Sequence, residues 1–453
     1  MGDKTLKRAA VCLFVLLYVP YLYQQGYQRA GQLPGDFPTL YWGAKMVFEE
    51  GRSPYVQGAF DRIAEREQRR IFPYLYPPPS LLCFYPFSTV TYAAAKVWLL
   101  VVSHVCFLLI LYLLFLKIRP FDPPPAWRWL TAALMIVYVL NYYPVVDNFA
   151  WGQINLIVLA LVCVAWLALK RGGHALGVAL PLSLAVLLKT YPVLLLPLLI
   201  FRKRYAAAAW VVGLLALYGV VSWWWLPRGL WGDWLTNIAP TGGYGLRPFN
   251  LFLPVEPWNH SINGFMLFVQ DRTQEVWGFP VRYVTRPLTY LFAGAVGAAT
   301  LGLALLSARR GRGETTLDAD VALFLLMMFL VAPLSWEHHL VYVLPAALFA
   351  VNILLKETTR PLAALGAVAA LFVLAWDFPR DDMYLIKGVF GISNAIKFFA
   401  ALGLWLFVAK KMWDGLREER SQGTGGRSQE SPPAEVVDDS RTVRHAAGLS
   451  PEF

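Results

Sequence analysis

Long apolar runs alternate with short polar connections along most of the chain. Runs of about 20 apolar residues recur, and most connections between them carry lysine or arginine. Because every backbone polar group in lipid needs an internal hydrogen bond, each run predicts a helix. The runs lack the residue-by-residue alternation of outer-membrane barrel strands. The pattern therefore predicts an all-α polytopic membrane protein.

Lysine and arginine orient the predicted spans, since short cytoplasmic loops are enriched in both residues. This rule places both termini inside and gives nearly every short inner loop a positive charge. It predicts about ten full spans, which cover Leu6–Tyr23, Tyr92–Leu116, Trp129–Tyr143, Gln153–Leu169, Ala206–Leu226, Pro287–Leu306, Ala319–Pro333, Leu340–Leu355, Leu362–Trp376 and Val389–Ala409.

The run Ala175–Phe201 departs from this pattern. Lys170-Arg171 precedes it and Arg202-Lys203-Arg204 follows it, so both flanks carry the inner signature. Lys189-Thr190-Tyr191-Pro192 interrupts its middle, and the residue before a proline resists the α conformation. We therefore expect a broken, re-entrant pair of short helices here instead of one full span.

The topology leaves two large outer segments, at about residues 24–91 and 227–285. Residues 1–412 would then form one integral membrane domain. Residues 413–453 are rich in serine, glycine, proline and acidic side chains and show no apolar period. Such a composition predicts a disordered tail, which the topology places in the cytoplasm.

Composition and charge narrow the class further. Of 453 residues, 57% are hydrophobic and 15% are charged, against roughly 25% charged in soluble domains. The net charge of +11 fits cytoplasmic loops rich in basic residues. Because the basic residues are scattered and do not form one face, the sequence disfavours nucleic acid as a partner. It also contains no glycine-rich phosphate loop, so nucleotide binding has no support.

Asp36 is the first candidate for chemistry, because it follows the first span on the outer side. It precedes Phe37-Pro38 and a predicted amphipathic helix from Pro38 to Glu50, so it fits an ordinary helix N-cap. A helix N-terminus at a membrane interface also favours anions, which keeps a functional role open.

Two further candidates combine aromatic, proline and basic residues. Tyr76, before Pro77-Pro78-Pro79, fits either an interfacial anchor or the wall of a groove for a lipid-linked substrate. Lys189 lies within an apolar run, where a charge costs several kcal/mol unless it snorkels or is paired. It either reaches the inner surface or points at an anionic head group or a structural carboxylate.

Trp336-Glu337-His338-His339 marks an outer turn between two apolar runs. The pair of histidines fits an interfacial feature or a hydrogen-bonded cap. Its spacing is not that of a zinc helix, where two histidines lie four residues apart, so we expect no catalytic metal. An imidazole positioned near a phosphate is the functional alternative.

Amide side chains form a last group of candidates at outer membrane edges. Gln153 and Asn155 either bond between helices or bind sugar hydroxyls, and Asn263 in the second outer segment is a further polar position. Asp318-Ala319-Asp320 has the spacing of a metal-binding Asp-x-Asp, but it falls on the inner side. It is better interpreted as the start of a helix.

Taken together, these residues resemble a known family. Their order and spacing are similar to those of the bacterial polyprenyl-phosphate-sugar-dependent glycosyltransferases of family 87, from about Leu6 to Lys411. Single motifs are weak, whereas the ordered set is fairly specific. The elements are Asp36-Phe37, Gly51-x-x-Pro54-Tyr55, Tyr76-Pro77-Pro78, Gly152-Gln153-x-Asn155, Lys189-x-x-Pro192 and Pro333-x-Ser335-Trp336-x-His338-His339.

The resemblance implies a cell-envelope enzyme of the GT-C fold in the bacterial cytoplasmic membrane, with its active site at the outer face among membrane lipids. It implies a sugar, most often mannose, carried on a polyprenyl phosphate and transferred with inversion to a glycolipid or glycan acceptor. The family's catalytic aspartate corresponds to Asp36. Its histidine corresponds to His338 or His339, of which we favour His339, and Lys189 matches a motif whose role stays open.

The implied reaction needs a base and a stabilised leaving group. A sugar hydroxyl is a poor nucleophile, so Asp36 would accept its proton as the bond forms. Histidine or basic side chains would stabilise the departing phosphate, so no metal or other cofactor is expected. The alternative is a transporter or flippase of lipid-linked sugars, which the lysine beside a broken helix also fits.

Overall fold

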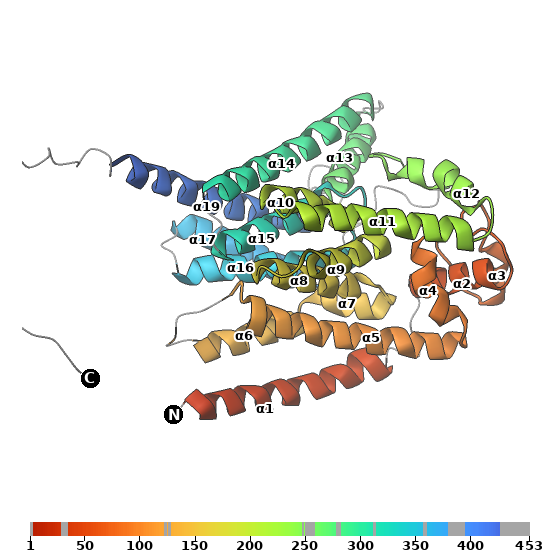
Figure 1. The fold of residues 1–453 in the computed structure, drawn as a ribbon, viewed down its shortest axis with the longest axis horizontal. Helices are drawn as coiled ribbons and strands as arrows, with labels where there is room; N and C mark the ends of the chain where they lie inside the picture. The colour runs from red at the N-terminus through yellow and green to blue at the C-terminus, as the bar shows by residue number, and fades with distance from the viewer. Residues whose placement is uncertain are drawn as a thin grey trace, which may run out of the picture.

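The computed structural model describes residues 3–28, 35–121, 125, 128–246, 249, 259–277, 282–310, 314–356, 360–378 and 395–425. Within these ranges every regular element is helical, which confirms the predicted all-α class. The long helices run side by side in one bundle, and several short helices gather at one end of it (Figure 1).

The elements follow the predicted runs closely. The first half of the chain contains α1 (Asp3–Leu22), η1 (Tyr23–Gln28), α2 (Phe37–Phe48), α3 (Asp61–Arg66), α4 (Ser80–Ser88), α5 (Tyr92–Tyr112), η2 (Leu113–Ile118), α6 (Arg128–Leu140), α7 (Tyr143–Trp151), α8 (Asn155–Lys170), α9 (Ala175–Leu188), η4 (Tyr191–Leu195), α10 (Leu196–Phe201) and α11 (Tyr205–Trp225). The second half contains α12 (Leu230–Asn237), η5 (Ala239–Gly242), α13 (Ile262–Trp277), α14 (Arg282–Arg310), α15 (Glu314–Val331), η7 (Glu337–Val343), α16 (Leu344–Lys356), α17 (Pro361–Ala375) and α19 (Ile396–Gly425).

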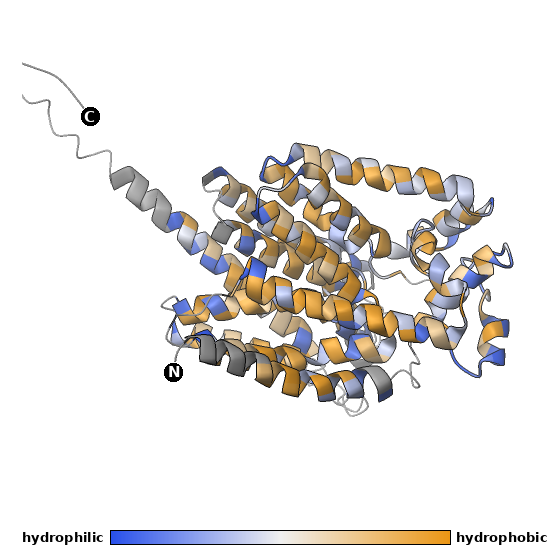
Figure 2. Ribbon diagram, turned by 60° about the horizontal axis from the view of Figure 1, so that its bottom comes forward, coloured by the Kyte–Doolittle hydropathy of each residue, from blue (hydrophilic) through white to orange (hydrophobic). Residues whose placement is uncertain are grey.

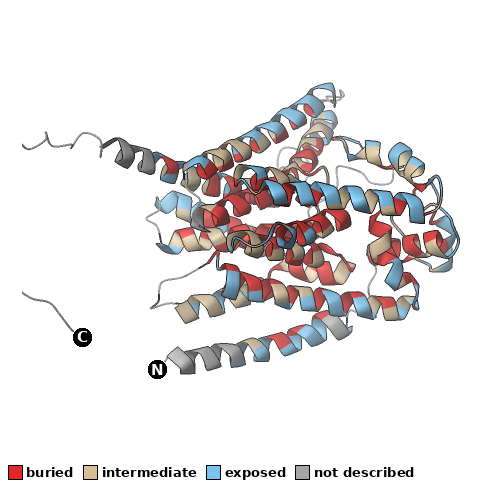
Figure 3. Cartoon of the chain, viewed as in Figure 1, coloured by how far each residue is buried: buried red, intermediate tan, exposed pale blue. Residues whose placement is uncertain are grey.

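The surface of the bundle is apolar where a soluble protein would be polar. Exposed fractions reach 70% for Leu16, 86% for Trp224 and 81% for Leu362. Apolar residues cover much of the bundle, and the outward faces of α5 and α11 are exposed along their length (Figures 2 and 3). Five segments of the described chain are long and apolar enough to cross a membrane, and four shorter apolar helices accompany them. The protein is therefore a multi-pass membrane protein.

Two ion pairs fasten one end of the bundle. Lys170 at the end of α8 lies 2.6 Å from Asp318 of α15, and Arg202 after α10 lies 2.5 Å from Asp320. The predicted helix start at Asp318-Ala319-Asp320 thus falls in the first turns of α15, and its carboxylates bind neighbouring helices.

The predicted break in the run 175–201 is confirmed. Helix α9 ends at Leu188, Lys189 is extended with φ −144° and ψ 131°, and η4 and α10 follow. Because Lys170 and Arg202 bind neighbouring carboxylates of α15, the chain leaves one end of the bundle and returns to it. Both basic flanks therefore lie at the same end, as the charge pattern predicted.

Short helices fill the described part of the two predicted outer segments. In the first segment α2 packs against α4, and α2 closely matches the helix predicted from Pro38 to Glu50. Asp36 precedes α2, yet its side chain makes no capping hydrogen bond, so the N-cap alternative does not account for it. In the second segment α12 and α13 are the helices.

Some predicted boundaries differ or lie outside the described residues. The tail was predicted from Trp413, but α19 continues to Gly425 because the last apolar run passes into a charged helical stretch. Residues 426–453, the start of the last predicted span at 389–394, and parts of both outer segments (29–34, 250–258 and 278–281) lie outside the described ranges.

Removing one partner of the ion pair between Arg202 and Asp320 should destabilise the protein strongly, because the other charge is then left buried. Arg202→Met leaves the fully buried Asp320 carboxylate without this cation, so we expect the free energy of unfolding to fall by about 3–5 kcal/mol. Thermal unfolding in detergent micelles measures the loss. Lys410→Met, which removes an exposed pair with Asp414, should change the melting temperature little. Equal melting temperatures for both variants would contradict a structural role for the Arg202–Asp320 ion pair.

Candidate functional site

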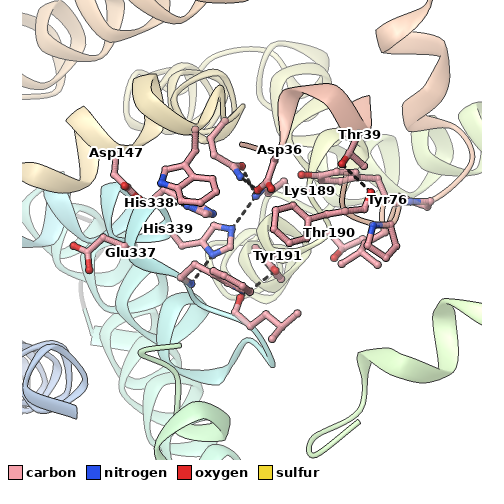
Figure 4. A pocket seen from close by; sticks show the side chains of 18 of the residues that line it. Asp36, Thr39, Tyr76, Asp147, Lys189, Thr190, Tyr191, Glu337, His338 and His339 are labelled. Atoms are coloured by element: carbon pink, nitrogen blue, oxygen red, sulfur yellow. Dashed lines mark hydrogen bonds and ion pairs between the residues drawn. The ribbon is translucent and has the colours of Figure 1, made fainter. Parts of the chain in front are cut away.

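A cavity of about 450 Å³ lies where distant segments of the chain meet. Its wall combines the start of α2, the chain between α3 and α4, the end of α7, the break after α9, and the start of η7 with the turn before it (Figure 4). The lining residues used below are Asp36, Arg70, Tyr76, Asp147, Trp151, Gln153, Lys189, Trp336, Glu337, His338 and His339.

Asp36 reaches the cavity through a close approach of two backbones. Its N–H donates to the Trp151 carbonyl at 3.0 Å, which ties the start of α2 to the end of α7. Gly35 lies in this contact with φ +30°, and a Cβ there would collide with the Trp151 backbone. The Asp36 carboxylate is partly buried, and its Oδ2 accepts a hydrogen bond from Gln153 Nε2.

Gln153 links this carboxylate to Lys189. Gly152 ends α7 in a left-handed conformation, φ 62°, which turns the following residue toward the cavity. While the amide nitrogen of Gln153 donates to Asp36, its Oε1 accepts from Lys189 Nζ at 3.3 Å. Both polar atoms of the amide are therefore used within the cavity wall.

Lys189 occupies the break in the apolar run and is 6% exposed. Its Nζ lies 2.8 Å from His339 Nε2 and 5.8 Å from the centre of the Tyr76 ring. These contacts rule out snorkelling to the inner surface in this structure. Lys189 instead lies in the cavity between Asp36 and His339 (Figure 4).

His339 is oriented by its own turn. Its Nδ1 accepts the backbone N–H of Trp336 at 2.9 Å, so a neutral imidazole carries its hydrogen on Nε2. That nitrogen faces the amine of Lys189. An Nε2–H of His339 can donate to Lys189 Nζ only when Lys189 is a neutral amine, so the contact holds one hydrogen between the two groups.

His338 faces the opposite side of the cavity. Its Nδ1 lies 3.5 Å from Asp147 Oδ2, and its ring stacks on Trp336 with 6.3 Å between centroids. Asn148 Nδ2 donates to the His338 carbonyl at 2.7 Å. Helix α7 therefore supports the turn that carries both histidines.

Most residues predicted for the site are brought together, but two amides are not. Asp36, Tyr76, Gln153, Lys189, Trp336, His338 and His339 all line the cavity. Asn155 lies behind the wall, where it binds the Tyr342 hydroxyl and the His338 carbonyl. Asn263 binds Gly245 N and the Pro333 carbonyl. Both amides therefore form hydrogen bonds within the protein. For Asn155 this is the first of the two alternatives given by the sequence, a bond between helices.

The structure adds cavity residues that sequence reasoning missed. Asp147 is a buried carboxylate in helix α7, and a buried carboxylate among apolar helices is itself a signal of function in a membrane protein. Arg70 follows Arg69 in the first outer segment, and its guanidinium lies 5.1 Å from the Phe72 ring centre. Neither residue belongs to a recognised sequence motif, so their place in the cavity wall becomes visible only in the fold.

Burial sets the electrostatics of the Asp36 carboxyl. Desolvation raises its pKa above the ordinary value, whereas His338, Lys189 and the Gln153 hydrogen bond lower it. The nearby Asp147 adds to the rise. Burial outweighs the nearby cations, which favours a carboxylate able to accept a proton.

Comparison with known proteins connects this cavity to a family. The model of glycosyltransferase family 87 matches residues 74–333, more than half of the chain. The chain belongs to glycosyltransferase family 87. The match confirms the resemblance drawn from the motifs, and it spans Tyr76, Gln153 and Lys189.

Two curated relatives of this family 87 protein carry the same name. One is the polyprenol-phosphate-mannose-dependent alpha-(1-2)-phosphatidylinositol mannoside mannosyltransferase of Mycolicibacterium smegmatis, 26% identical over 387 residues and covering 80% of each chain. The other is the protein of that name from Mycobacterium tuberculosis, 27% identical over 389 residues, covering 83% of this chain and 84% of its own.

Proposed function

We propose that this family 87 protein is an inverting glycosyltransferase that moves a sugar from a polyprenyl-phosphate donor to a hydroxyl of a glycolipid or glycan acceptor. Mannose is the preferred sugar, because both curated relatives are named as polyprenol-phosphate-mannose-dependent. Their names also give a phosphatidylinositol mannoside as acceptor, which supports a glycolipid here. The competing transporter hypothesis has no support from the family.

One observation carries the proposal: a carboxylate and a lysine–histidine pair meet in one cavity. Gln153 joins Asp36 to Lys189, and Lys189 contacts His339 at 2.8 Å. The carboxylate can accept the proton of the attacking hydroxyl, and the basic pair can stabilise the negative charge of the leaving phosphate. A transfer with inversion needs both functions in one cavity, with the base on the acceptor side of the reacting carbon and the basic groups on the side of the leaving phosphate.

Three carboxylates line the cavity, and their partners single out Asp36 as the base. Glu337 is paired with Lys397 and His260, and Asp147 faces His338. Asp36 accepts from the neutral amide of Gln153 and forms no ion pair within the described part of the chain. A carboxylate without a bound cation keeps its affinity for a proton, as a base requires.

The phosphate of the donor would lie beside Lys189 and His339. Two more cavity residues, Arg70 and Tyr76, extend this wall toward the first outer segment. Arginine and lysine both bind phosphate oxygens, and they count for more in a partly dehydrated cavity than in water.

We place the cavity at the outer face of the bacterial cytoplasmic membrane, with both termini in the cytoplasm and a GT-C-type bundle of about ten spans. The basic flanks at Lys170 and Arg202 support this orientation, because positive charge favours the cytoplasmic side. Helix α8 runs from the cavity edge at Asn155 to Lys170, about 24 Å at the helical rise. The cavity and the basic flanks therefore lie at opposite ends of this helix.

Replacing the proposed base tests the mechanism directly. Asp36→Asn keeps the size of the side chain and removes its ability to accept a proton, so turnover should fall by about 10²–10⁴-fold. Transfer of radiolabelled mannose from polyprenyl-phosphate mannose measures it, with melting temperature and donor affinity as controls for folding. Asp147→Asn is the matched variant of a second cavity carboxylate. Near-normal turnover of Asp36→Asn would remove Asp36 from the mechanism.

The raised pKa of Asp36 predicts where activity is lost in acid. A base must be deprotonated, so kcat/KM should fall as the pH decreases through a pKa above the ordinary carboxyl value of about 4. Gln153→Leu removes a hydrogen bond that lowers this pKa, so the acidic limb should move to still higher pH. An acidic limb at the ordinary value in both proteins would contradict this account.

We also propose that transfer needs no metal ion. The donor is a phosphodiester with one negative charge, and the departing polyprenyl phosphate gains a second charge as its bond to the sugar breaks. Lys189, His339 and Arg70 line the cavity and can stabilise that charge. Treatment with EDTA followed by buffer exchange should leave the rate within about twofold, a change small on the scale of an oxyanion contact. A loss that added Mg²⁺ or Mn²⁺ restores would sink this part of the proposal.

A further inference from the structure

A buried cluster of three charged or titratable groups lies beside the two histidines of η7, and its Glu337 also lines the cavity. The exposed fractions are 6% for Glu337, 6% for His260 and 2% for Lys397. Lys397 Nζ donates to Glu337 Oε1, and His260 Nε2 lies 3.0 Å from Glu337 Oε2. Both oxygens of one carboxylate are thus held from different directions.

The three groups come from separate parts of the chain. His260 stands just before α13, Glu337 begins η7, and Lys397 lies in the first turn of α19. The backbone N–H of His260 also donates to the Ser335 carbonyl at 2.7 Å. The cluster therefore clamps the turn before η7 between the second outer segment and the last described helix.

This clamp acts on the residues that line the cavity. Glu337 is flanked in sequence by Trp336 and His338, and His339 follows. In Figure 4 Glu337 lies on the far side of the histidines from Tyr76, whereas Lys189 and Asp36 lie toward the centre. The contacts of Lys397 and His260 with the Glu337 carboxylate therefore hold the start of η7 in place, while His338 and His339 line the cavity.

Stability alone is a weak reason for such a cluster. A buried ion pair contributes little net free energy compared with a well-packed apolar replacement, because desolvation offsets the attraction. It does fix geometry, since only one arrangement satisfies both oxygens. A positional role is therefore the better explanation for charges buried beside a cavity.

We propose that Lys397 and His260 are positioning residues for sugar transfer, acting through Glu337. They hold His339 against Lys189 and His338 against Asp147, so the last described helix is part of the catalytic machinery. This inference rests on the proposed function. It adds two residues, 137 positions apart in the chain, that no motif of the sequence marked.

Lys397→Met tests the proposal in the full-length protein, purified in detergent with polyprenyl-phosphate mannose and a phosphatidylinositol mannoside as substrates. A small displacement of a catalytic group lowers kcat strongly, so we expect a loss of about tenfold to a hundredfold. KM for both substrates should stay within about threefold, because Lys397 touches neither. Lys397→Arg should recover most of kcat, since it restores the cation.

Two variants separate positioning from general damage. Lys170→Met leaves a buried carboxylate, Asp318, without its lysine at the other end of α8, and should lower the melting temperature without lowering kcat of the folded enzyme. Glu337→Gln with Lys397→Met removes both charges, so it should fold well even if Lys397→Met does not, and kcat should remain low.

The outcomes are distinct. A wild-type kcat in folded Lys397→Met or in the double variant overturns the positioning role, as does an equal loss of kcat in Lys170→Met. If the wild-type protein transfers no mannose, the proposed function fails instead. Transfer by the wild type with full activity in Lys397→Met would leave the function standing and remove only this inference.

Discussion

A charge placed among apolar helices must find a partner, because moving an ion out of water costs several kcal/mol. This constraint organises the whole molecule. Its buried charges gather in two groups at opposite ends of α8: Lys170 with Asp318 and Arg202 with Asp320 at one end, and the cavity residues at the other. Buried residues fill the bundle between these groups (Figure 3), and most of them are hydrophobic.

The two groups of buried charges find their partners differently. The group at the basic end has a structural role, and the group in the cavity has a chemical one. At the basic end each carboxylate is matched by a cation at 2.5–2.6 Å, and Trp166 adds a hydrogen bond to Asp318. In the cavity the Asp36 carboxylate accepts from the Gln153 amide and from no other donor among the described residues, and Lys189 faces an imidazole. Matched charges fix helices, whereas Asp36 and the Lys189–His339 pair stay available to a substrate.

The sequence predicted the helices and the broken run because both follow from local rules. Apolar runs long enough to cross a membrane require helices. Basic residues on both flanks of the run around Lys189-Pro192 require the chain to return to the side from which it came. The convergence of Asp36, Gln153, Lys189 and His339 rested on the resemblance to the family, since 303 positions separate the first from the last. Asp147, Lys397 and His260 could not be found in this way, because each is defined by a contact between distant segments.

Because of the break at Lys189, one short segment of the chain contacts both the cavity and the basic end of the bundle. A continuous helix from Ala175 to Phe201 would carry its lysine in mid-membrane and its terminal arginine to the wrong side. The extended backbone at Lys189 and the turn through η4 allow α9 to deliver a lysine to the cavity and α10 to deliver Arg202 to Asp320. The position of Lys189 opposite His339 therefore depends on the ion pair that anchors α10, and the geometry of the cavity depends on charges that no substrate touches.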